Sequence, residues 1–133
     1  MRILIDTNVL ISAALFPGSV PYQAYVKAVS YPNHGLLCEQ NIEELTRIFR
    51  KKFPAREEAL ERYLAEELPA LEVIRIPTER TALERKIRDP NDRSILRAAV
   101  AAEADILLTG DKDFLESGVV RPSILTPAEF LKV

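Results

Sequence analysis

An α/β fold with a central, mainly parallel sheet is predicted by two features of the sequence. Short aliphatic runs bounded by polar residues recur along the chain, for example at residues 3–5 and 106–108. Such runs are typical of strands that are buried on both faces of a parallel sheet. Segments with apolar residues at helical spacing lie between the runs. This alternation indicates strands joined by right-handed helical crossovers, with helices flanking the sheet.

The first half of the chain divides readily into elements. A strand at residues 3–5 leads into an apolar helix at 8–16, which Pro17-Gly18 ends. Residues 21–30 carry apolar side chains at helical spacing and predict a second helix, and residues 36–38 predict a short strand. Asn41 is expected to cap a helix that ends before Pro54. Residues 56–68 form another amphipathic pattern that stops at Pro69.

The second half continues the alternation. Residues 71–76 predict a strand, whereas 78–88 fit either a short helix or irregular structure. The sequence Asp89-Pro90-Asn91-Asp92 is expected to begin a helix, followed by a strand at 106–108 and a helical turn at 112–116. A last short strand is predicted at 123–125. Thr126-Pro127-Ala128-Glu129 fits a capping box with proline at the first helical position.

Composition excludes several classes of protein. The 133 residues are enough for one domain, residues 1–133, with a hydrophobic core, and 47% hydrophobic with 29% charged residues is ordinary for such a domain. The longest apolar stretches are too short to cross a bilayer, and the N-terminus lacks a secretory pattern, so we expect a cytoplasmic protein without a membrane partner. A net charge of −2 does not by itself indicate nucleic-acid binding.

The single cysteine and the single histidine limit the chemistry further. Cys38 excludes an internal disulfide and a cysteine-based zinc site, and its apolar neighbours favour a thiol packed in a strand. His34 lies in a predicted turn, so a paired-histidine metal site is impossible and a histidine general base is not favoured.

Two aspartates stand immediately beyond aliphatic runs, and they provide the strongest functional signal. Asp6 follows residues 3–5, and Asp111 comes shortly after residues 106–108. In an open α/β sheet, ligands bind in the crevice beyond the carboxyl ends of the strands. Carboxylates gathered there repel each other and require a positive partner to stay ionised together. A divalent metal ion is the simplest candidate.

Four motifs, in this order, resemble the PIN domain family. They are Asp6-Thr7-Asn8 after the first strand, the Glu44-Leu45 step within a helix, Asp89-Pro90-Asn91-Asp92, and Leu108-Thr109-Gly110-Asp111-Lys112-Asp113. The final Leu125-Thr126-Pro127-Ala128-Glu129-Phe130-Leu131 is similar to the end of PIN proteins described as toxins of toxin–antitoxin pairs. The resemblance covers essentially the whole chain and implies a three-layer PIN-like fold.

The resemblance also implies a function. It predicts an endoribonuclease that uses Mg²⁺ or Mn²⁺, is the VapC-like toxin of a type II toxin–antitoxin pair, associates with an antitoxin and forms a homodimer. Carried over by position, the catalytic and metal-binding acids are Asp6, Glu44, Asp92 and Asp111, with Asp113 as a supporting metal ligand. Glu44 is preferred as the second acid because it directly precedes Leu45, and Glu43 remains the alternative.

The chemistry of these residues agrees with that expectation. Mg²⁺ takes oxygen ligands and keeps several waters, and two such ions can stabilise the attacking and leaving oxygens of a phosphodiester displacement. A water whose pKa the cation lowers serves as nucleophile, so the scarcity of histidine and cysteine is no obstacle. The expected hydrogen-bond donors and phosphate contacts around the acids are Thr7, Asn8, Arg47, Lys51, Arg93, Thr109 and Lys112.

Simpler interpretations exist for each residue taken alone. Asp92 can serve a helix N-terminus, Glu44 can belong to a solvated helix face, and Asp111 can belong to a turn. The basic residues 50–52 are equally explained as solvated charge. A haloacid-dehalogenase phosphatase needs a second aspartate at position 8, which is Asn8, and a receiver domain needs acids that are absent. The main alternative is a PIN fold that binds RNA or protein without cleavage.

Overall fold

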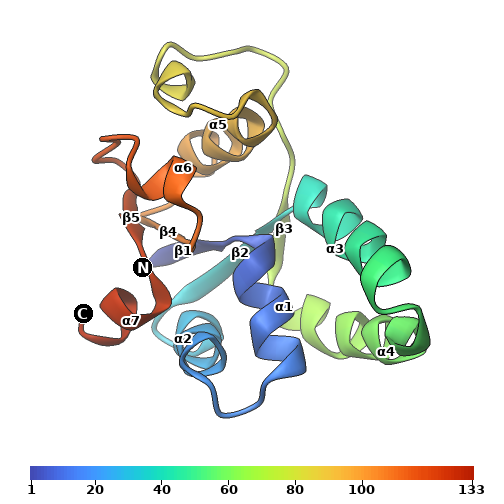
Figure 1. Cartoon of the computed structure of the whole chain (residues 1–133). Coiled ribbons are helices and arrows are strands. Elements are labelled where there is room, and N and C mark those ends of the chain that lie inside the picture. Colours follow the sequence, from blue (N-terminus) through green and yellow to red (C-terminus); the bar gives the residue numbers. More distant parts are fainter.

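The computed structural model describes the whole chain, residues 1–133, and places a five-stranded parallel sheet at its centre (Figure 1). The strands lie in the order β3-β2-β1-β4-β5 and every neighbouring pair is parallel. Their bounds are β1 Arg2–Ile5, β2 His34–Cys38, β3 Glu72–Ile74, β4 Ile106–Leu108 and β5 Ser123–Leu125. The predicted fold class, helices on both faces of a parallel sheet, is confirmed.

Seven α-helices and four short 3₁₀ turns complete the chain. The helices are α1 Thr7–Leu15, α2 Val20–Val29, α3 Glu39–Lys52, α4 Glu57–Glu67, α5 Arg93–Ala101, α6 Lys112–Leu115 and α7 Pro127–Leu131. The 3₁₀ turns are η1 Pro54–Arg56, η2 Leu68–Ala70, η3 Leu83–Lys86 and η4 Pro90–Asp92. No single helix has the length and apolar composition needed to cross a membrane, and α1 and α2, which pass that test only as a pair, meet at 111°.

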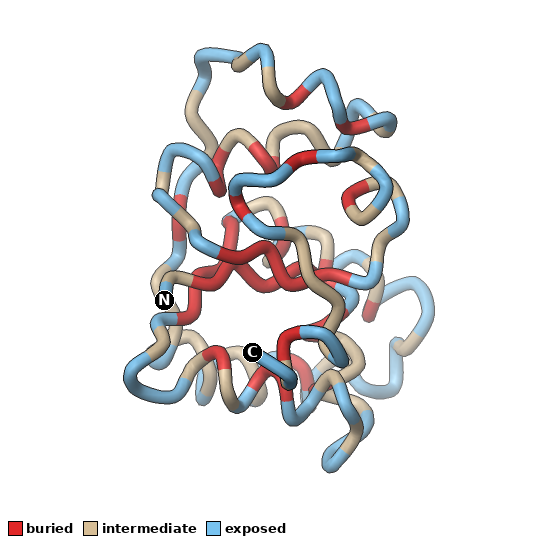
Figure 2. Tube along the Cα trace, turned by 90° about the vertical axis from the view of Figure 1, so that its left-hand side faces the viewer, coloured by how far each residue is buried: buried red, intermediate tan, exposed pale blue.

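The two faces of the sheet bury separate hydrophobic cores because successive strand side chains point to opposite sides. Ile3 and Ile5 of β1 pack with α1, α2 and Phe130 of α7. Leu4, between them, packs on the other face with α5 and Phe114 of α6. Figure 2 shows the buried residues concentrated in the strands and in the helix surfaces that face them. The result is the three-layer arrangement that the sequence predicts.

Helices α3 and α4 extend beyond this sandwich and pack against each other (Figure 1). Leu45 and Phe49 of α3 form a small third core with Leu60 of α4. Ile11 and Leu15 of α1 border this core and connect it to the rest of the molecule. Helix α3 therefore approaches the sheet through its first turns, which follow directly from β2.

Several predicted element boundaries are wrong. Helix α3 begins at Glu39 with Cys38 at its N-cap position, so Asn41 lies inside the first turn and does not cap the helix. The strand expected at 71–76 spans only Glu72–Ile74. Residues 78–88 contain the turn η3, and the Asp89 motif forms η4 before α5 starts at Arg93. The capping box at Thr126 with Pro127 in the first turn is confirmed.

Strand β1 lies at the centre of the sheet, with β2 and β3 on one side and β4 and β5 on the other. The direction in which the chain adds strands reverses between β1 and β4, and ligands in open α/β sheets bind beyond the carboxyl ends of the strands at such a point. Asp6 follows β1 directly, and Thr109 follows β4 directly. The topology thus brings the motif that follows β1 and the motif that follows β4 to the same edge of the sheet, where the strands end.

Candidate active site

Asp6 is the most deeply placed acid at this edge. Its side chain is 7% exposed, and its backbone N–H donates to the carbonyl of Leu108, which extends the pairing of β1 with β4. Oδ1 accepts a hydrogen bond of 2.9 Å from the N–H of Thr7, so Asp6 also caps α1. Oδ2 accepts a hydrogen bond of 2.7 Å from the hydroxyl of Thr109. The carboxylate orientation is fixed from two directions.

Thr109 couples Asp6 to Asp111. Its hydroxyl is buried, donates to Asp6 and accepts the backbone N–H of Asp111 at 3.0 Å. The Asp111 carboxylate is half-buried and accepts the N–H of Asp113 at 2.9 Å, which caps α6. One side chain at the end of β4 therefore sets the position of both aspartates.

Asn41 is a site residue that the sequence analysis missed. It is 1% exposed, and its amide nitrogen donates to the hydroxyl of Thr7 and, at 3.4 Å, to Oδ1 of Asp6. Its Oδ1 is buried without a hydrogen-bond partner. A signal was present in the sequence, because Asn41 continues the i, i+4 stripe of Leu45 and Phe49 with a polar side chain.

Glu44 and Glu43 point to different surroundings. The charge of Glu44 acts on both Asp6 and Asp92 and raises the pKa of each carboxyl. Glu43 is exposed and lines a shallow hollow of about 590 Å³ on the outer side of α3 with Arg47 and Lys51. Glu44 is thus the glutamate that the fold turns toward the aspartates.

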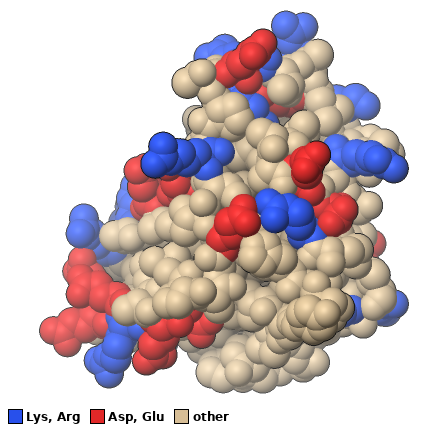
Figure 3. Space-filling view, turned by 180° about the vertical axis from the view of Figure 1, so that it is seen from behind, with Lys and Arg blue, Asp and Glu red and all other residues tan.

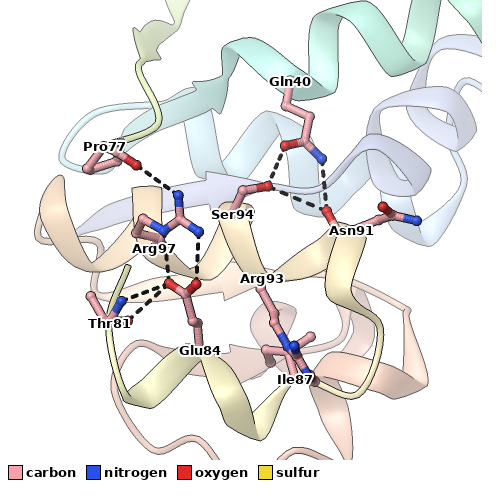
Figure 4. Close-up of polar contacts among 9 residues, drawn as sticks. All are labelled: Gln40, Pro77, Thr81, Glu84, Ile87, Asn91, Arg93, Ser94 and Arg97. Atoms are coloured by element: carbon pink, nitrogen blue, oxygen red, sulfur yellow. Dashed lines mark hydrogen bonds and ion pairs between the residues drawn. The ribbon is translucent and has the colours of Figure 1, made fainter. Parts of the chain in front are cut away.

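Asp92 stands at the junction of η4 with α5 and is half-buried. Figure 4 shows how Gln40, in the first turn of α3, holds this junction. The Gln40 amide nitrogen donates to the carbonyl of Asn91 at 3.0 Å, and its oxygen accepts the hydroxyl of Ser94. The first turn of α3 therefore fixes the segment that carries Asp92, while Asn41 in the same turn contacts Asp6.

Burial and mutual repulsion raise the pKa values of two of these acids. Burial is the largest cause for Asp6, whose pKa rises to about 6 although the hydrogen bonds from Thr109 and Thr7 oppose the shift. The pKa of Asp92 rises to about 7, first through burial and then through the charges of Asp111, Asp89, Asp6 and Glu44. Glu44 and Asp111 are therefore close enough to act on both Asp6 and Asp92, and no basic residue is among the causes that shift either pKa.

A second group of acids shares Asp92 with the four predicted acids. Carboxylate oxygens of Asp89, Asp92 and Asp113 all lie within 4.8 Å of one another. Two of these acids already have partners: Asp89 caps η4 through the N–H of Asn91, and Asp113 accepts from Nε of Arg88 at 2.9 Å. Asp111, Glu44 and Asp6 have no ionic partner. We therefore centre the site on the predicted four acids, with Asp89 and Asp113 at its rim.

The remaining predicted residues are spread over a wider area. Thr7 is buried beside Asp6, whereas Asn8 and Lys112 are exposed without hydrogen-bond partners for their side chains. Arg47 and Lys51 lie on the outer side of α3 with Glu43. The Nε of Arg93 donates to the carbonyl of Ile87 at 2.9 Å, so this guanidinium turns toward η3 rather than toward the acids.

The donor set suits a hard divalent cation. Several carboxylates converge at one edge, two of them carry pKa values well above the ordinary range, and the groups that orient Asp6 are neutral. A bound cation would relieve the repulsion that the protein leaves uncompensated. Another surface hollow, of about 770 Å³, is lined by residues such as Met1, Asp105 and Ser123 at the opposite, amino-terminal edge of the sheet.

Comparison with known proteins agrees with this geometry. The PIN domain model matches residues 2–113, a span that includes all four acids. A toxin–antitoxin complex from Klebsiella pneumoniae contains a chain that is 26% identical, with a TM-score of 0.67 over 94% of this chain and 97% of that one. No curated protein has significant similarity to the sequence.

Two further solved structures share the fold at lower identity. VapBC2 from Rickettsia felis, bound to a promoter DNA fragment, has a chain with TM-score 0.72 and 20% identity over 95% of this chain and 98% of that one. PAE2754 from Pyrobaculum aerophilum has TM-score 0.66 and 18% identity over 99% and 88%. The resemblance drawn from the sequence is confirmed, and the chain belongs to the PIN domain family.

Proposed function

We propose that the protein is a divalent-metal-dependent endoribonuclease that hydrolyses RNA phosphodiester bonds. The observation that carries the proposal is the convergence of Asp6, Glu44, Asp92 and Asp111 at the carboxyl edge of the sheet, where the charges of Glu44 and Asp111 help to raise the pKa values of Asp6 and Asp92. Membership of the PIN family supports the same conclusion. Mg²⁺ or Mn²⁺ is the proposed cofactor because these ions take oxygen ligands.

The chain's own residues would prepare the site for catalysis. Asp6, Glu44, Asp92 and Asp111 would hold the cation, with Asp113 as a supporting acid. When bound, the cation supplies Lewis-acid stabilisation of charge that develops on the phosphate and lowers the pKa of a nucleophilic water. The Thr109 hydroxyl fixes the position of Asp6 relative to Asp111, because it hydrogen-bonds to both residues. Asn41 donates to both Asp6 and Thr7 and holds these two side chains together.

The experiment that tests the proposal is cleavage of a mixed structured RNA by the purified protein with Mn²⁺, Mg²⁺ or EDTA. We expect cleavage with either metal, none with EDTA, and a loss of at least a hundredfold in Asp6→Asn. The chain offers a matched pair of controls, because Glu44→Gln is expected to lose activity and Glu43→Gln to keep it. Cleavage that persists in EDTA or in Asp6→Asn would overturn the proposal.

The alternative is a PIN-fold module that binds RNA or protein without cleavage. It predicts that the wild type binds RNA but never cuts it, with or without metal. The unpaired acids favour the nuclease, since a binding surface for a polyanion gains nothing from clustered negative charge. RNA binding without cleavage by wild-type protein would favour the module.

We further propose that the protein is the toxin of a type II toxin–antitoxin pair, acts in the cytoplasm and forms a homodimer. Similarity to a chain of the Klebsiella pneumoniae toxin–antitoxin complex supports an antitoxin partner. The outer surface near α1 and α2 exposes several large apolar side chains, namely Phe16, Val20, Tyr22, Val26 and Tyr31, which is a suitable composition for a protein interface. Growth arrest on expression of wild type but not of Asp6→Asn tests the toxin role.

A further inference from the structure

A polar hollow beside the candidate active site is not used by the chemistry described above. Its volume is about 320 Å³, and it lies between η3 and the beginning of α5. Four arginines line it, Arg80, Arg85, Arg93 and Arg97, together with a single acid, Glu84. In Figure 3, seen from the side opposite Figure 1, charged side chains gather over the upper end of the molecule, where the segment carrying η3 lies.

One arginine of the four is already neutralised. Arg97 donates from Nε and Nη2 to both oxygens of Glu84, at 2.9 and 2.8 Å, and from Nη1 to the carbonyl of Pro77 (Figure 4). Thr81 donates to the same carboxylate. Glu84 is buried and Arg97 mostly so, and the hydrogen bonds from Arg97 are the largest cause that lowers the pKa of Glu84, to about 2. This pair fixes η3 on α5 and is structural.

The other three arginines retain free positive charge. Arg80 and Arg85 are exposed and form no ion pair or side-chain hydrogen bond. Arg93 uses Nε for the carbonyl of Ile87 and has no acidic partner, which leaves the rest of its guanidinium available. The hollow therefore carries three guanidinium groups that have no acidic partner. Apart from Ala82 and Pro90, its lining residues are polar or charged.

The hollow and the acids share one structural segment. Pro90 and Ser94 line the hollow, and Asp92 lies between them in the chain. The Ser94 hydroxyl is bound by Gln40, whose neighbour Asn41 contacts Asp6. The positive hollow is thus held beside the negative site by the same turn of α3. The hollow therefore borders the turn that carries Asp92.

We propose that this arginine-lined hollow binds phosphate groups of the RNA strand that flank the bond to be cleaved. The inference rests on the proposed ribonuclease function and adds where the substrate backbone lies. Guanidinium groups are well suited to phosphate oxygens because they offer several donors in one plane. An acidic peptide would present carboxylates but would usually also need apolar anchors, which the hollow lacks.

Binding of a short fluorescein-labelled oligouridylate, followed by anisotropy at several salt concentrations, tests the proposal. All proteins carry Asp6→Asn so that cleavage does not interfere. Arg80→Ala/Arg85→Ala removes two exposed charges from the hollow. If both contact phosphates, the affinity lost between roughly 50 and 200 mM salt becomes about sevenfold smaller, since each contact contributes about 0.7 to the salt slope for single strands. Arg80→Lys/Arg85→Lys is expected to keep the slope.

The matched control is Arg62→Ala/Arg121→Ala, which removes the same charge from exposed positions on α4 and near β5. Equal slopes for this control and for Arg80→Ala/Arg85→Ala would overturn the proposal, as would absence of RNA binding. A polyglutamate peptide that binds in place of RNA would assign the hollow to an acidic protein segment instead. Metal-dependent cleavage by wild type would stand in any of these cases, so failure here is distinct from failure of the nuclease.

Discussion

Asp6 has only neutral hydrogen-bond donors. Oδ1 accepts from the Thr7 N–H and Oδ2 from the Thr109 hydroxyl, and no lysine or arginine contacts either oxygen. Neutral donors orient a carboxylate and partly stabilise its charge, but they do not cancel its repulsion with other acids. The protein thus sets the geometry of Asp6, while the charge of the acid cluster stays unbalanced and open to the cation proposed above. This division of roles makes the metal-free protein sensitive to pH.

Stability of the metal-free protein is expected to fall as pH rises from about 4 to about 7. The pKa of Asp6 is about 6 and that of Asp92 about 7, both above the ordinary 3.8. A raised acid pKa means that the folded state holds its proton more tightly than the unfolded state. The resulting stabilisation is complete below the unfolded pKa and is lost as pH passes the folded values.

Urea denaturation in EDTA at a series of pH values measures this effect. The double variant Asp6→Asn/Asp92→Asn serves as control, because it removes both titrating groups. We expect the free energy of unfolding to depend less on pH in the variant than in the wild type across the same range. Parallel curves for the two proteins would show that burial of these acids has no influence on stability.

Asn41 provides a second prediction at the residue scale. Asn41→Ala removes the donor to Thr7 and Asp6 and leaves buried groups without partners. We expect a loss of about 1–3 kcal/mol in the free energy of unfolding and weaker metal binding. Asn8→Ala is the control, since Asn8 is exposed and forms no side-chain hydrogen bond. Similar stabilities for the two variants would contradict the role assigned to Asn41.

Sequence patterns alone pointed to Asp6 and Asp111 because each stands at a recognisable boundary, whereas Glu44, inside α3, was assigned only from the resemblance to the PIN family. Asp6 follows a buried strand, and Asp111 begins α6 shortly after another. Asn41 escaped prediction because an asparagine near a helix start also suits a cap. Only the contact with Asp6, whose position is 35 residues away in the chain, shows its actual role.

At the scale of elements, β2 packs closely against α2 at Gly35. A Cβ at this position would lie 2.9 Å from Cγ1 of Val29 and 2.9 Å from Cδ2 of Leu71. Valine has little rotational freedom in a helix, so the neighbouring elements must move apart to accept a methyl group. Gly35 therefore lets the helix lie close to the strand.

Gly35→Ala is expected to lower the free energy of unfolding by about 1–3 kcal/mol through overpacking. Gly110→Ala is the control, because a Cβ there meets no atom within 4 Å. Thermal or urea unfolding of the two variants measures the difference. Equal stabilities would mean that α2 adjusts to the methyl group without cost.

Segment 78–88 illustrates which elements local patterns do not predict. Its sequence has no clear apolar periodicity, and its order comes from the buried Glu84–Arg97 pair and from packing of Ile87 on the sheet. Those contacts join residues in different elements, so the local helix or strand propensity of the segment does not predict them. In contrast, the strands are short apolar runs, which the sequence displays directly.

The whole molecule gathers acids from four separate segments, the ends of β1 and β4, helix α3 and the η4–α5 junction. A cation held by all of them stabilises the folded state, because the unfolded chain has no such site. Mn²⁺ at about one hundred times its dissociation constant should add about 2.7 kcal/mol. The melting temperature of the wild type is therefore expected to rise by several degrees with metal, whereas Asp6→Asn should respond much less.

The central position of β1 also bears on how the protein is made. β1 is synthesised about a hundred residues before its partner β4, since Ile3 pairs with Ile106. A nascent chain can pair β1 with β2 early and already contains Asp6 and Glu44, but it lacks the later aspartates. The acid cluster is completed only after Asp111 has left the exit tunnel. The nuclease proposed above would therefore lack part of its acid cluster until synthesis of the chain is nearly complete.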